Sequence, residues 1–181
     1  MPRHLLEFDN PDRFVPGTIG PPGARTFFLQ ARQGRALVSV SLEKVQMAAL
    51  AERLRDLLDA VQPGGAGPDR GGRSPTADKL EEPLVDAFRV GTMALGWNPA
   101  SERVVIEATP VEGDGEGSEA DAHADADAAD ADLLRVSIAT PTAFAFVELA
   151  ASLLAAGRPT CPFCGEVLGP DGHFCPRTIL N

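Results

Sequence analysis

Residues 26–40 read TFFLQARQGRALVSV, and this stretch decides the fold. Two runs rich in apolar side chains flank the pair Gln33-Gly34. Glycine readily adopts the positive φ that a tight hairpin turn requires. The pattern therefore predicts an antiparallel hairpin with strands at 26–32 and 35–40.

The hydrophobic period changes directly after this hairpin. Apolar side chains recur at helical spacing and form one stripe, made of Leu50, Leu54, Leu57 and Val61. Ser41 is the expected N-cap, and Pro63-Gly64 supplies the stop. The sequence predicts an amphipathic helix that packs on the sheet.

The second half of the chain has a similar order of elements. Strands are expected at 84–95, 103–108 and 134–138, the first two joined by turn residues at 97–101. Thr140 is the expected N-cap of a second helix, with Pro141 at its first position. Short connections favour antiparallel pairing. We therefore expect an α+β fold in which an antiparallel sheet built from hairpins carries two amphipathic helices on one face.

Two segments differ in composition from the rest. Residues 112–132 hold nine acidic and no basic residues, so the formal charge of −10 would be −1 without them. Residues 62–79 are rich in Gly and Pro. Both are expected to be disordered loops of an α+β domain at 1–157, followed by a tail at 158–181. A nucleic-acid mimic or a cation-binding tract is the alternative interpretation of the acidic loop.

Cysteine usage and hydropathy indicate the compartment. All three cysteines lie between positions 161 and 175, whereas a secreted protein usually spreads an even number along the chain. No apolar run approaches the roughly 20 residues that span a bilayer. The first residues lack the apolar stretch of a secretory signal. We expect a cytoplasmic protein without a membrane segment.

The cysteines form the strongest chemical motif. Cys161 and Cys164 can bind one ion from a tight turn, and Gly165 relieves the backbone there. His173 and Cys175 follow after a Gly-Pro-rich stretch and offer two more ligands. A Cys₃His set matches a closed tetrahedral zinc site, so we predict a structural Zn²⁺ held by all four residues. Reduced surface cysteines, a different fourth ligand, or a Cys161–Cys164 redox pair are the alternatives.

Several segments resemble a known family. They are residues 6–14 (LEFDNPDRF), 25–32 (RTFFLQAR), 41–46 (SLEKVQ), and the terminal motifs CPFCG at 161–165 and GHFCPR at 172–177. The chain resembles an actinobacterial family of uncharacterised proteins, domain of unknown function 3090. This resemblance covers most of the chain outside the two loops, and it implies no particular activity.

No catalytic motif is present: the sequence lacks a P-loop, a G-x-S-x-G elbow and an H-E-x-x-H helix. We expect a non-enzymatic, zinc-stabilised interaction or regulatory protein that contacts a protein or a small ligand. A small enzyme with a site near Arg25, Arg32 and Glu43 is one alternative. Another alternative is nucleic-acid binding through the predicted zinc site, which would make the tail at 158–181 a zinc knuckle. Against it, Arg158 and Arg177 are the only Lys or Arg residues in this tail.

Overall fold

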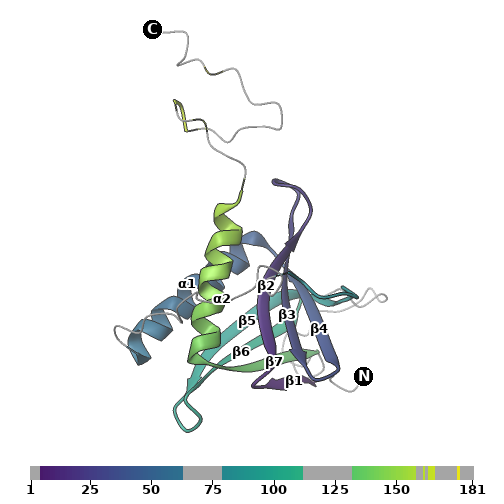
Figure 1. The fold of residues 1–181 in the computed structure, drawn as a ribbon, viewed down its shortest axis with the longest axis vertical. Coiled ribbons are helices and arrows are strands. Elements are labelled where there is room, and N and C mark those ends of the chain that lie inside the picture. The colour runs from purple at the N-terminus through teal and green to yellow at the C-terminus, as the bar shows by residue number, and fades with distance from the viewer. Residues whose placement is uncertain are drawn as a thin grey trace, which may run out of the picture.

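Figure 1 shows the computed structural model, which describes residues 5–62, 79–111, 132–157, 161, 163–165 and 175. The elements are β1 (Leu5–Asp9), β2 (Arg13–Ile19), β3 (Thr26–Gln33), β4 (Ala36–Leu42), α1 (Lys44–Val61), β5 (Asp86–Asn98), β6 (Arg103–Pro110), β7 (Leu133–Ala139) and α2 (Thr140–Ala155). The predicted hairpin at 26–40 is confirmed as β3 and β4. Most of the two predicted loops, 63–78 and 112–131, lies outside the described residues, as does most of the tail.

The strands form one mixed sheet in the order β1-β7-β6-β5-β4-β3-β2. Two antiparallel meanders, β2–β3–β4 and β5–β6–β7, are each followed by a helix. The prediction of a purely antiparallel sheet is wrong at two places, because β4 pairs with β5 and β1 with β7 in parallel. Helix α1 connects β4 to β5, and such a crossover returns the chain in the same direction.

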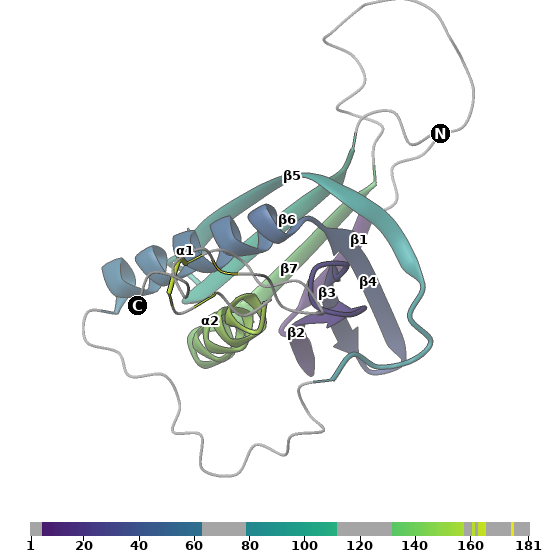
Figure 2. The ribbon, with the colours of Figure 1, turned by 90° about the horizontal axis from the view of Figure 1, so that it is seen from above.

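The sheet curls strongly. Its two edge strands, β1 and β2, are joined by residues 10–12 alone. Six strand intervals of a flat sheet would span roughly 29 Å, whereas this connection reaches about 14 Å. Hydrogen bonds also attach β1 and this connection to the end of β3: the Gly34 N–H donates to Asp12 Oδ2 at 2.7 Å, and Gln33 Nε2 donates to the Asp9 carbonyl at 3.1 Å. Figure 2 shows the resulting curved sheet.

Both helices lie on the inner side of this curve, as expected (Figure 2). Buried residues of α1 are Met47, Leu50, Ala51, Leu54 and Leu58. On the sheet, alternate residues of β6 and β7 face the core: Val104, Ile106 and Ala108 are opposite Ile138, Val136 and Leu134. Phe146 of α2 stacks on Phe14 of β2 with ring centroids 5.0 Å apart. The periodicity of each segment therefore places its apolar face in one common core.

The start of α1 differs from the prediction. Ser41 belongs to β4 and is buried, and both its backbone N–H and its hydroxyl donate to the Asp86 carboxylate. The N-cap is Glu43, which forms a capping box with Gln46; the Gln46 Oε1 accepts from the Glu43 N–H at 2.8 Å. Ser41 is not the cap because the strand pairing continues past it to Leu42.

The start of α2 is shifted by one residue. Ala139 is the N-cap and Thr140 the first helical residue, so Thr140 as N-cap is wrong. Pro141 stands in the first turn, where its missing N–H leaves no intrahelical bond unmade.

Neither helix of the described chain has the length and apolar character needed to cross a bilayer.

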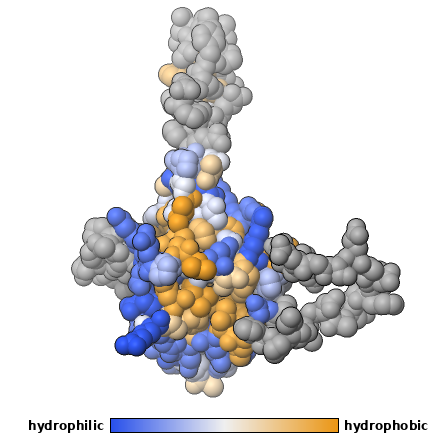
Figure 3. Space-filling view, turned by 90° about the vertical axis from the view of Figure 1, so that its right-hand side faces the viewer, coloured by the Kyte–Doolittle hydropathy of each residue, from blue (hydrophilic) through white to orange (hydrophobic). Residues whose placement is uncertain are grey.

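Residues 79–85 run across the outer face of β2, β3 and β4. The Leu80 side chain lies directly over Gly17, and the Glu81 carboxylate is 3.2 Å from Arg32 Nε. Figure 3 shows the side of the molecule that lies on the right of Figure 1, where an apolar area is surrounded by polar side chains. The outer face of this half of the sheet is therefore covered by chain rather than by a helix.

Candidate metal centre

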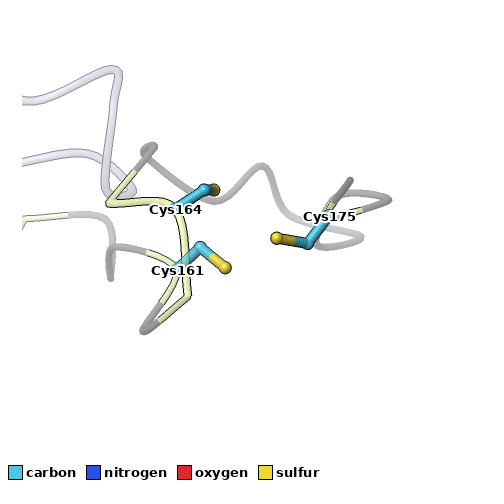
Figure 4. A group of neighbouring side chains, drawn as sticks. All are labelled: Cys161, Cys164 and Cys175. Carbon is cyan, nitrogen blue, oxygen red and sulfur yellow. The ribbon is translucent and has the colours of Figure 1, made fainter. Parts of the chain in front are cut away.

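Three cysteines from two parts of the terminal segment converge. The Sγ atoms of Cys161, Cys164 and Cys175 all lie within 4.8 Å of one another. Cys161 and Cys175 are buried, with 5% and 7% exposure, and Cys164 is half-buried. Figure 4 shows the side chains of Cys161 and Cys175 directed toward each other. The convergence predicted from the spacing is confirmed for these three residues.

A tight turn places the first two cysteines side by side. The Gly165 N–H donates to the Cys161 carbonyl at 2.9 Å, which closes the chain around positions 161–165. Gly165 has φ +78°, a left-handed conformation that favours glycine over residues with a side chain. The glycine after the second cysteine is thus part of the geometry that aligns the two thiols.

The cluster has the geometry of a donor set for a soft metal ion. Zn–S bonds of about 2.3 Å in a tetrahedron separate the sulfurs by about 3.8 Å, which is compatible with the 4.8 Å limit of this cluster. No disulfide joins these three cysteines. Thiolates are soft ligands that bind zinc and similar ions. The three cysteines could therefore hold a metal ion together.

The fourth predicted ligand, His173, lies outside the described residues. A set of three thiolates leaves one corner of a tetrahedron for a further ligand. His173 as that ligand, and zinc as the ion, therefore remain predictions.

The residues of the alternative enzyme site do not converge. Each makes its own contact: Arg25 Nη1 donates to the Leu153 carbonyl at 3.4 Å, Arg32 pairs with Glu81, and Glu43 pairs with Arg89. Arg25 precedes β3 and Arg32 lies near its end, so about 23 Å of extended chain separates them. This arrangement does not form a single polar site.

One concave feature is not indicated by any motif in the sequence. A groove of about 290 Å³ lies between α1 and β5. The one residue in the sequence that indicates a local irregularity there is Gly91, because a glycine inside an apolar strand often marks a β-bulge. The residues that form it come from two elements that are separated by the first long loop, so local patterns could not have shown it.

A mixed, curved sheet with two helices and a cysteine cluster defines an α+β protein with a candidate metal site. One family model matches residues 6–175, nearly the whole chain. The chain belongs to that family, which is described as "Protein of unknown function (DUF3090)". The predicted membership of this family is confirmed, whereas the actinobacterial origin stays a prediction. No curated protein and no solved structure matches the chain.

Proposed function

We propose that this chain is a non-enzymatic interaction or regulatory protein whose terminal segment is stabilised by a structural zinc ion. The ligands are Cys161, Cys164, His173 and Cys175. The observation that supports this proposal is the mutual approach of three cysteine sulfurs within 4.8 Å.

A structural role follows from the ligand count. Four protein ligands fill a tetrahedral zinc ion and leave no position for water or substrate. Residues 158–181 form a short segment, well below the roughly 40 residues under which a domain rarely folds on a hydrophobic core alone. Metal binding supplies folding free energy in such cases. A cytoplasmic location is part of the proposal, because a reducing compartment keeps the thiols available as ligands.

The partner is proposed to be a protein or a small ligand. Phe163 lies in the turn between Cys161 and Cys164 and is 59% exposed, so it offers an apolar contact next to the metal. Nucleic-acid binding is less well supported, since phosphate contacts require clustered Lys or Arg and this segment holds only Arg158 and Arg177.

Elemental analysis of the purified chain tests the metal. We expect one zinc per chain in wild type, loss of zinc in Cys164→Ser, and weaker zinc retention in His173→Ala during dialysis against a chelator. His123→Ala is the matched control, since His123 stands in the acidic tract and should leave the metal content unchanged. A wild-type protein without metal and with three titratable thiols would contradict the proposal.

Two further assays test the interaction role. A metal-replete sample that turned over a substrate, and lost this activity on one polar substitution, would show an enzyme instead. Salt-dependent retention on nucleic acid would favour the nucleic-acid alternative. We expect neither result.

A further inference from the structure

The groove between α1 and β5 is separate from the cysteine cluster. Its volume is about 290 Å³, and it is lined by the first half of α1 and the middle of β5. The lining side chains are mainly apolar, and Val45 at its border is 71% exposed. Arg53 is the only charged residue among those that line the groove.

A β-bulge at Gly91 explains why the groove is open. The β5–β6 register shifts between Val90 and Thr92, and a Cβ on Gly91 would lie 2.7 Å from the Pro110 carbonyl oxygen. Bulges bend the strand that contains them. Val90 is 1% exposed, but Met93 and Leu95 beyond the bulge are only partly buried.

These two side chains belong to the core face of the sheet. Met93 is opposite Ala108 and Leu95 opposite Ile106, and these β6 partners are 1% and 2% exposed. The apolar face thus continues past the region that α1 covers. Burial of further apolar area by a ligand is therefore favourable there, because it removes these side chains from water.

The polar groups of the groove differ in their availability. Gln46 Nε2 donates to the carbonyls of Val90 and Gly91 at 3.0 and 3.1 Å, while its Oε1 accepts from Glu43. Gln46 is therefore occupied within the protein. Arg53 is exposed and forms no ion pair with another described residue. Its guanidinium is the group that can receive an anion.

We propose that this groove binds a small amphipathic molecule with an apolar chain and one carboxylate. The apolar chain of this ligand lies over Met93 and Leu95, and its carboxylate contacts Arg53. The groove is at the lower end of the size range of small-molecule sites. A protein partner fits less well, because a stable interface buries about 800 Å² on each side, and the charged residues Lys44, Glu52 and Asp56 interrupt the exposed face of α1.

Isothermal titration of the full chain with decanoate tests the proposal. We expect saturable binding to wild type and loss of binding in Ala49→Phe, because Ala49 is an exposed residue that lines the groove and Phe fills it. Ala48→Phe is the matched control: Ala48 is also exposed but does not line the groove. Absence of saturable binding, or equal binding by both variants, overturns the proposal.

The anion contact has its own test. Arg53→Gln should weaken decanoate binding about threefold to fivefold, as expected for a partly exposed ion pair, and should leave decanol binding unchanged. Arg55→Gln, on the same helix but outside the groove, should bind decanoate as wild type does. Equal affinities of the two variants overturn the carboxylate as the recognised group. Zinc content is measured on the same samples. A failure of ligand binding in the groove can then be distinguished from a failure of zinc binding at the cysteine cluster.

Discussion

At the scale of single residues, Gln30 carries a buried amide that is fully hydrogen-bonded. It is 1% exposed, in the middle of β3. Its Oε1 accepts from Arg13 Nη1 at 3.0 Å and from the Glu81 N–H at 2.7 Å. Its Nε2 donates to Ser39 Oγ and to the Glu81 carbonyl, both at 3.0 Å. All four hydrogen-bonding positions of the amide are therefore used.

Replacing this amide should be strongly destabilising. Gln30→Ala removes four hydrogen bonds, including that of the buried Ser39 hydroxyl and those of the part-buried Glu81 backbone, so we expect a loss of about 2–4 kcal/mol in the free energy of unfolding. Urea unfolding, followed by the fluorescence of the single tryptophan, Trp97, measures it. The control Gln33→Ala removes one exposed hydrogen bond and should lose less than about 1 kcal/mol. Equal losses would contradict this role of Gln30.

The contrast between Gln30 and the cysteines shows what local sequence can predict. Cys161 and Cys164 are three positions apart in a turn marked by Gly165, so their approach follows from spacing alone. The sequence predicts that Cys175 joins them, because a metal requires further ligands. Gln30, in an apolar run, gives no such signal, since its main partner Glu81 lies 51 positions away, beyond the first long loop.

At the scale of elements, the segment 79–85 has the role of a cover for β2, β3 and β4. A Cβ at Gly17 of β2 would lie 2.4 Å from Leu80 Cγ, so this glycine makes room for the leucine. Gly17→Ala should therefore displace Leu80 and cost about 1–3 kcal/mol, as overpacking does. Limited proteolysis should cut within 79–85 faster, and urea unfolding should give the energy.

Gly96 of β5 provides the control for this prediction. A Cβ there meets no atom within 4 Å. Gly96→Ala should therefore leave stability unchanged or raise it slightly, because alanine restricts the unfolded chain. If both alanine variants behaved alike, the contact between Leu80 and Gly17 would not contribute to holding the segment in place.

The elements themselves were largely predictable, and their parallel pairings were not. Hairpins and helices follow from local turn residues and hydrophobic period, as at Gln33-Gly34. The β4–β5 pairing has only two register pairs, Ser39 with Asp86 and Ser41 with Arg89, and depends on the crossover through α1. Such long-range contacts have no local signature. The two cap assignments failed for a related reason: the extent of strand pairing decided where each helix began.

At the scale of the whole molecule, the described hydrophobic core is built without the cysteines. Its buried members run from Phe8 to Ala150, and the partly buried neighbours end at Leu154. The edge strands β1 and β2 of the curled sheet are also joined without the terminal segment, through residues 10–12. The cooperative stability of the α+β part should therefore depend little on a metal ion in the terminal segment.

Metal removal gives the test of this independence. A ligand stabilises only the cooperative unit that contains its binding site, so a chelator should shift the thermal midpoint of Trp97 fluorescence by less than about 2 °C. Trp97 is a suitable probe because it is partly buried against the core. The same treatment should make residues 158–181 sensitive to carboxypeptidase in wild type, whereas Cys164→Ser should be sensitive before any chelator is added. A midpoint lowered by about 5 °C or more would instead show that the cysteine cluster and the sheet unfold as one unit, because the metal's binding free energy would then contribute to the stability of the entire chain.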